Sequence, residues 1–132
     1  MRFLIDTHLL IWAVGVSGRL PSKARDIISD PDNELSFSAA SLWEIAIKSG
    51  RRRDDFQIDV GLIRRTLLTS YYDELPVTGE HAVAVADLPP LHKDPFDRLL
   101  IAQSIVEGIT LSPPIGTWRA IPGRSVSCHR PP

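Results

Sequence analysis

The chain has 132 residues, 43% of them hydrophobic, and a formal net charge of −1. This size and composition indicate a single globular domain with a core of its own, and they argue against a disordered chain or a strongly cationic nucleic-acid binder. One cysteine excludes an internal disulfide and favours a reducing cytoplasm, and no apolar stretch approaches the roughly 20 residues of a membrane-spanning helix. We therefore expect a cytoplasmic protein that has no membrane partner.

The first third of the chain alternates strand-like and helix-like segments. Residues 2–5 are a short apolar run that predicts a buried strand, and Asp6 ends this run before a helix that we expect around residues 9–13. A second helix is predicted to open at Pro21, and residues 35–37 predict a second strand.

Two further helices are predicted in the middle of the chain. Ser41 and Glu44 have the spacing of a capping box, which predicts a helix start there, and Gly50 is a natural stop for that helix. Apolar residues at helical spacing predict an amphipathic helix over residues 60–72. Residues 75–77 then read as a short strand.

The last predicted elements have the clearest local signals. Thr78 or Gly79 starts a short helix, and Asp94 followed by Pro95 combines a preferred N-cap with a preferred first helical residue. Gly108 is expected to close the helix that Asp94 opens, before a strand at residues 109–111. Strands that alternate with helices imply a parallel sheet with helices on both faces, which is an α/β fold.

The end of the chain differs from the rest in composition. We assign residues 1–111 to one domain and residues 112–132 to an atypical tail, because the tail holds five of the eleven prolines and no acid. Such a segment is expected to be poorly ordered or loosely docked.

Four acids stand where a strand ends or a helix begins. Asp6 follows the first strand, Glu44 lies near the start of the helix after the second, and Asp94 and Asp97 open a later helix one turn apart. Ligands of open α/β sheets gather at the carboxyl ends of the strands, so these acids are expected to meet in one crevice. Carboxylates brought together there are costly unless Mg²⁺ or Mn²⁺ neutralises them.

Each acid taken alone also has a structural explanation. Asp6 and Asp94 are suited to cap helices, Glu44 could complete a capping box, and Asp97 suits the positive end of a helix dipole. The functional prediction therefore depends on the four acids being found together.

Three stretches resemble the signature blocks of PIN-domain ribonucleases, and most closely those of VapC toxins: residues 4–8 (LIDTH), 41–48 (SLWEIAIK) and 92–103 (HKDPFDRLLIAQ). The resemblance implies a three-layer α/β/α PIN-like fold with a central, mainly parallel sheet of four to five short strands. It also implies Mg²⁺-dependent cleavage of RNA such as tRNA or another structured RNA, a homodimer, and inhibition by an antitoxin whose helix enters a groove between the helices at 9–13 and 60–72.

The same resemblance assigns roles by position. Asp6 and Asp97 would bind the metal, Glu44 would bind it or position the attacking water, and Asp94 would support the same site. Candidate substrate-binding residues are Thr7, Lys48 and Arg98. Trp12 and Trp43 are interpreted as core or partner-interface residues rather than as platforms for nucleobases.

One departure from the family pattern leaves alternatives open. Relatives usually carry another aspartate after the late strand, whereas no acid follows Glu107 here. The chain could therefore be a catalytically impaired homologue that acts only as an antitoxin-binding dimer. A phosphotransfer domain in which Asp6 is phosphorylated is a third interpretation, although no suitable second-motif lysine is evident.

Overall fold

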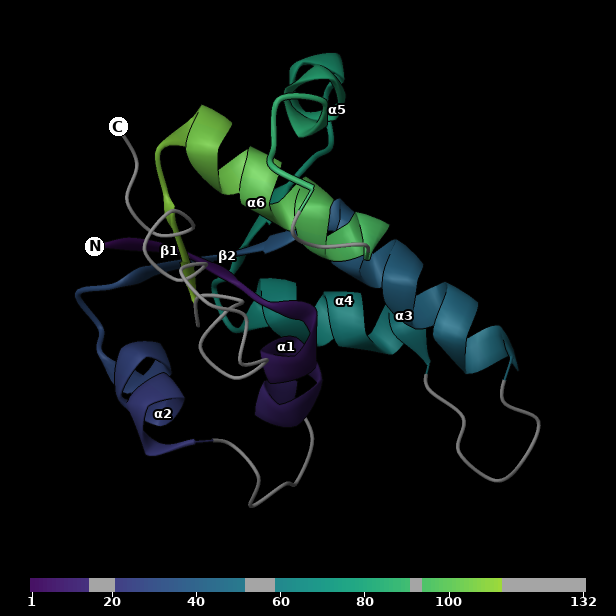
Figure 1. Ribbon diagram of the computed structural model, residues 1–132. Coiled ribbons are helices and arrows are strands. Elements are labelled where there is room, and N and C mark those ends of the chain that lie inside the picture. Colours follow the sequence, from purple (N-terminus) through teal and green to yellow (C-terminus); the bar gives the residue numbers. More distant parts are fainter. Residues whose placement is uncertain (15–20, 52–58, 91–93, 113–132) are drawn as a thin grey trace.

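A single parallel sheet organises the protein. The structure is a computed structural model that describes residues 1–14, 21–51, 59–90 and 94–112. Within these ranges the sheet has the strand order β3-β2-β1-β4, with every neighbouring pair parallel (Figure 1). Its strands are β1 (Arg2–Ile5), β2 (Glu34–Ser38), β3 (Asp73–Leu75) and β4 (Thr110–Ser112).

Helices cover both faces of this sheet. On one side lie α1, α2 and α4, and on the other lie α5 and α6, whereas α3 contacts helices of both layers (Figure 1). This is the predicted three-layer α/β/α arrangement. The helices are α1 (Thr7–Val14), α2 (Ser22–Ser29), α3 (Ala39–Arg51), α4 (Val60–Thr69), α5 (Gly79–Val85) and α6 (Pro95–Glu107).

The apolar run of β1 divides between two core clusters. Phe3 and Ile5 belong to a cluster with α1, α2 and α4, and Leu4 between them belongs to a cluster with α6 and β4. Successive side chains of a strand point to opposite faces, so a strand buried on both faces needs a continuous apolar run. The first five residues thereby place β1 in the middle of the sheet, with Asp6 immediately beyond its end.

Helix α6 begins and ends as the sequence predicts. The Asp94 carboxylate accepts hydrogen bonds from the main-chain N–H groups of Phe96 (2.9 Å) and Asp97 (3.4 Å), and Pro95 is the first helical residue. At the other end Gly108 has a φ of 68°, a left-handed conformation that glycine adopts without steric cost. Local chemistry at both ends therefore fixes the helix that carries Asp97.

Helix α3 corrects one prediction. It begins at Ala39 rather than at Ser41, because Ser38 at the end of β2 already accepts a hydrogen bond from the N–H of Ala40. Gly50 does not stop the helix, which runs to Arg51. Ser41 and Glu44 therefore lie inside the helix and do not form a capping box.

Other element boundaries shift by a few residues. Helix α1 already starts at Thr7, α4 ends at Thr69, and β3 spans Asp73–Leu75 rather than 75–77. The predicted tail, apart from Ser112 in β4, lies outside the described residues. No helix in the described part of the chain is long and apolar enough to cross a membrane.

A buried histidine attaches α5 to α6. His81 is completely buried, its Nδ1 accepts a hydrogen bond from the N–H of Thr78 (3.0 Å), and its Nε2 lies 2.8 Å from Oε2 of Glu107. Gln103 Nε2 lies 3.4 Å from the same Nδ1. These contacts hold the short helix α5 against the helix that carries two of the predicted site acids.

Candidate functional site

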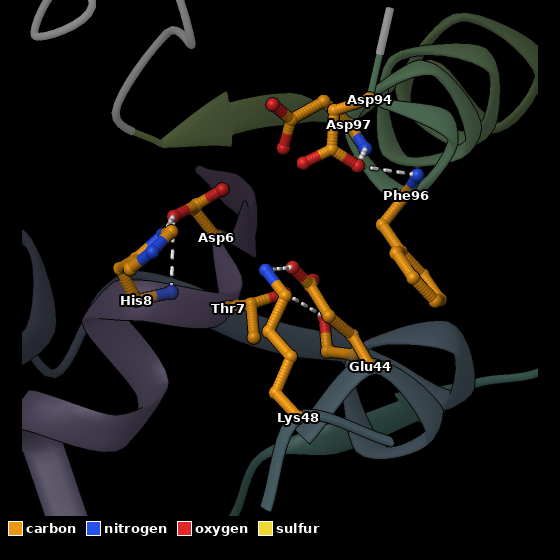
Figure 2. Close-up of polar contacts among 9 residues, drawn as sticks. Asp6, Thr7, His8, Glu44, Lys48, Asp94, Phe96 and Asp97 are labelled. Atoms are coloured by element: carbon orange, nitrogen blue, oxygen red, sulfur yellow. Dashed lines mark hydrogen bonds and ion pairs between the residues drawn. The ribbon is translucent and has the colours of Figure 1, made fainter. Parts of the chain in front are cut away.

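The four predicted acids meet at one edge of the sheet. Asp6 follows β1, Glu44 lies on α3 just after β2, and Asp94 and Asp97 stand at the start of α6. Figure 2 shows their carboxylates around a common space bounded by α1, α3 and α6. Asp6, Glu44 and Asp97 are buried, and Asp94 is partly buried. The fold thus brings together acids that are up to 91 positions apart in the numbering.

Asp6 has one oxygen that the protein leaves unsatisfied. Its side chain is 1% exposed, and its Oδ2 accepts a hydrogen bond from the main-chain N–H of His8 (3.0 Å) and lies 3.3 Å from His8 Nδ1. Its Oδ1 is buried and has no hydrogen-bond partner among the residues that the structure describes. A buried acceptor without a partner costs roughly 1–3 kcal/mol, so the structure keeps this oxygen available at a cost in stability.

Glu44 is paired with Lys48 one helical turn later. Lys48 Nζ lies 2.6 Å from Glu44 Oε2, at a spacing that places both residues on the same face of α3. The hydrogen bond to Glu44 raises the pKa of Lys48, and the charges of Glu44, Asp94 and Asp97 act in the same direction. Lys48 therefore lies within the electrostatic field of acids on both α3 and α6.

Thr7 connects two of the elements that carry the site. Its buried Oγ1 donates a 2.8 Å hydrogen bond to Ser41 Oγ, which joins the first turn of α1 to α3. Ser41 is thus a supporting residue that sequence reasoning assigned to a capping box instead. The one sequence signal that linked Ser41 to the site was its place in the same family-like stretch as Glu44, residues 41–48. That Thr7 binds substrate remains a prediction.

Arg98 is directed toward α5 by several hydrogen bonds. Its guanidinium donates to the carbonyl oxygens of Pro89 (2.9 Å), Val85 (3.0 Å) and Leu88 (3.5 Å). These bonds satisfy carbonyl groups at and beyond the end of α5, a structural use that competes with phosphate binding. The substrate role predicted for Arg98 stays a prediction, with less support than that of Lys48.

Trp43 is not a core residue. Its side chain is 61% exposed on α3, and its ring contacts the ring of Phe96 edge-on, with centroids 5.4 Å apart and an interplanar angle of 75°. Trp12, by contrast, is partly buried against the core cluster that includes α1 and α4. The core interpretation is therefore wrong for Trp43, and its partner-interface interpretation stays a prediction.

The described acids do not form a ready metal cage. In the described ranges, no three Asp, Glu, His or Cys side chains are grouped so that they could hold one ion. Lys48 engages Glu44, and the helix cap uses one oxygen of Asp94. The donor chemistry nevertheless fits a hard divalent cation, because it consists of carboxylate oxygens and includes the unpartnered Oδ1 of Asp6.

A hollow lies beside the core cluster that contains Phe3 and Ile5. Its volume is about 320 Å³, and it lies between α1, α2, β2 and α4. The residues that line it are Ala13, Val14, Ile28, Leu35, Thr66, Leu67, Ser70 and Tyr72. Part of its lining comes from the ends of α1 and α4, the two helices between which the antitoxin groove was predicted, and that groove stays a prediction.

Comparisons with known proteins extend these observations. A family described as PIN domain matches residues 3–111, which is well over half of the chain. The fold is similar to that of a chain in the crystal structure of VapBC2 from Rickettsia felis bound to a DNA fragment from its promoter, with a TM-score of 0.62, 14% sequence identity, and coverage of 92% of this chain and 94% of that one. No curated protein sequence matches the chain significantly.

Proposed function

The chain belongs to the PIN-domain family, and on that premise we propose that it is a VapC-type toxin that hydrolyses RNA with the help of Mg²⁺. Its substrate would be tRNA or another structured RNA, and its activity would be held in check by a cognate antitoxin in the cytoplasm. Each part of this proposal rests on particular contacts of the described residues.

The observation that carries the proposal is the unpartnered Oδ1 of Asp6 within a group of four acids. An oxygen buried without a donor, beside other negative groups, has the properties of a cation ligand. A pure capping role does not explain it, because the cap to His8 uses the other oxygen of Asp6.

Specific roles follow for the four acids. Asp6 and Asp97 would hold Mg²⁺ or Mn²⁺, Glu44 would bind the ion or position the attacking water, and Asp94 would keep α6 in place while adding negative charge. A bound divalent ion lowers the pKa of water and stabilises charge on the attacked phosphate, so no protein nucleophile is required. Lys48, whose side chain is 55% exposed, is well placed to contact a substrate phosphate.

The experiment that tests the proposal is RNA cleavage by the purified protein with Mg²⁺ and with a chelator. We expect cleavage only with Mg²⁺, and we expect Asp6→Asn to lose activity by at least about 100-fold while it remains folded. Asparagine keeps an oxygen that can accept the hydrogen bond from His8 but removes the charge. Asp26→Asn changes an exposed acid on α2 and is the matched control.

Activity that survives Asp6→Asn, or that is insensitive to the chelator, would contradict the proposed chemistry. A protein that neither binds Mg²⁺ nor cuts RNA would instead support the second candidate, an antitoxin-binding dimer without catalysis. The observation that favours this second candidate is the absence of any acid after Glu107.

The hollow beside α4 is the proposed antitoxin site. Helix α4 contributes Thr66 and Leu67 to the lining of this hollow. The same helix exposes Leu62 and Leu68, and Tyr71 just beyond it is almost fully exposed. Exposed apolar side chains around a groove are what an amphipathic partner helix needs. Co-expression with the antitoxin and a Leu62→Asp substitution, which should weaken the complex without unfolding the toxin, would test this site.

Trp43 supports the proposed homodimer. Aromatic residues are enriched at protein–protein interfaces, and the side chain of Trp43 is 61% exposed. Light scattering should give the mass of a dimer for the wild type and a smaller mass for Trp43→Asp.

A further inference from the structure

Lys48 is a positively charged residue that lies beside the four acids. Its Nζ lies 2.6 Å from the buried carboxylate of Glu44, and it also interacts electrostatically with Asp94 and Asp97 on the neighbouring helix. Figure 2 shows this ammonium group at the side of the space that the carboxylates surround. The lysine therefore neutralises part of the site before any metal binds.

The balance of charges limits how many metal ions the site can hold. The four acids carry four formal negative charges, one of which Lys48 offsets, so three remain. One divalent ion leaves the group slightly negative, whereas a second would make it positive. The sequence offers no further acid after Glu107 to restore the balance.

We propose that Lys48 acts as a resident second cation: it retains Glu44 as its partner, and the acids then bind a single divalent ion on the side of Asp6 and Asp97. This inference rests on the proposed metal site and refines it, because it assigns Glu44 to positioning rather than to direct ligation. Lys48 is accordingly a positioning residue, and it opposes tight metal binding through like-charge repulsion.

Two features of the structure support this assignment. The i, i+4 spacing on α3 holds Lys48 against Glu44 without any contribution from other elements. The available oxygen of Asp6 belongs to a different element, just beyond the end of β1, and its other oxygen is engaged by His8. The site thus has one part in which Lys48 engages Glu44, and another in which Oδ1 of Asp6 has no partner among the described residues.

The test is titration of the purified protein with Mn²⁺ alone, with binding measured by isothermal titration calorimetry. We expect one ion per wild-type chain. Lys48→Met removes the charge but keeps most of the stem, and it should tighten Mn²⁺ binding by about fivefold, because it removes a like-charge repulsion worth about 1 kcal/mol. Lys48→Arg keeps the charge and should bind Mn²⁺ as the wild type does.

Lys23→Met, an exposed lysine on α2, is the matched control and should change nothing. Circular dichroism verifies folding, and Lys48→Gln provides a second neutral variant should Lys48→Met fold poorly. Two ions per wild-type chain, or unchanged or weaker binding in both neutral variants, would overturn the inference and leave the proposed metal site intact. If the wild type binds no Mn²⁺, or Asp6→Asn binds it equally well, the proposed metal site fails and the inference fails with it.

Discussion

The buried hydroxyl of Thr7 donates a 2.8 Å hydrogen bond to Ser41 Oγ, and this contact joins the start of α1 to α3 directly beside the acids. Asp6 is adjacent to Thr7 in sequence, and Glu44 is one turn after Ser41. The distance between two of the site acids therefore depends on a hydrogen bond between residues that have no catalytic role in our proposal.

Removal of one partner of this hydrogen bond should destabilise the fold. Ser41→Ala leaves the buried Thr7 hydroxyl without its acceptor and should lower the free energy of unfolding by about 1–3 kcal/mol. Thr7→Val combined with Ser41→Ala removes both polar groups, so the double variant should lose less than the sum of the single variants. Urea denaturation measures all three, and Ser29→Ala at an exposed position is the control. Additive losses would show that the two hydroxyls do not interact.

His81 should be one of the most sensitive positions outside the site. His81→Ala leaves Glu107 and the N–H of Thr78 without their partner and opens a cavity, so we expect the free energy of unfolding to fall by about 2–4 kcal/mol. The exposed neighbour Glu80, changed to alanine, should have little effect. Thermal and urea unfolding measure both variants. A loss of unfolding free energy no larger than that of Glu80→Ala would show that the contacts of His81 between α5 and α6 contribute nothing to stability.

The ion pair of Arg64 and Glu74 should make a small, pH-dependent contribution to stability. The hydrogen bond from Arg64 holds the pKa of Glu74 below its ordinary value near 4.5. A carboxylate with a lowered folded-state pKa stabilises the protein above its ordinary pKa, and this contribution is lost as the pH falls through the lowered value. Glu74→Gln should therefore melt slightly below the wild type at pH 7.

The same difference should be smaller at pH 3, and salt should reduce it because the pair is partly exposed. Glu34→Gln, at an exposed position of β2, is the control. A difference in melting temperature that is equal at both pH values would show that it has another origin.

Gly108 should resist substitution for reasons of backbone conformation alone. Its φ of 68° disfavours a residue with a Cβ, although a Cβ there would meet no atom within 4 Å. Gly108→Ala should therefore cost about 1 kcal/mol. Gly79→Ala is the matched control: its Cβ would also meet nothing, its φ is negative, and the substitution should be neutral or slightly stabilising. Equal melting temperatures for the two variants would contradict the explanation.

Much of the framework follows from local sequence signals. The caps at Asp94 and Gly108 were predictable because each residue contacts main-chain groups within a few positions of itself. The burial of β1 was predictable because an apolar run with no polar alternation needs cover on both faces. The order of the elements, and a parallel sheet with helices on both faces, follow from the alternation of strand-like and helix-like segments.

Two aspects of the site depend on contacts that no local pattern describes. The apparent capping box at Ser41 and Glu44 was wrong because Ser38, at the end of β2, takes the capping role and Thr7, 34 positions away, takes the hydroxyl of Ser41. Trp43 was wrongly considered for the core because the apolar residues beside it in sequence lie on another face of α3.

By itself the sequence determined which acids the protein has and that three of them, Asp6, Asp94 and Asp97, would stand at the end of a strand or the start of a helix. The cap at Asp94 and the i, i+4 pair of Glu44 and Lys48 are local contacts. Only the tertiary structure decided that the four acids share one space and that one buried oxygen of Asp6 meets no donor among the described residues. The reason is physical, since a residue's position along the chain follows from local hydrogen bonding and burial, whereas the partner of a buried carboxylate is set by whichever distant groups the packed helices bring within about 3 Å.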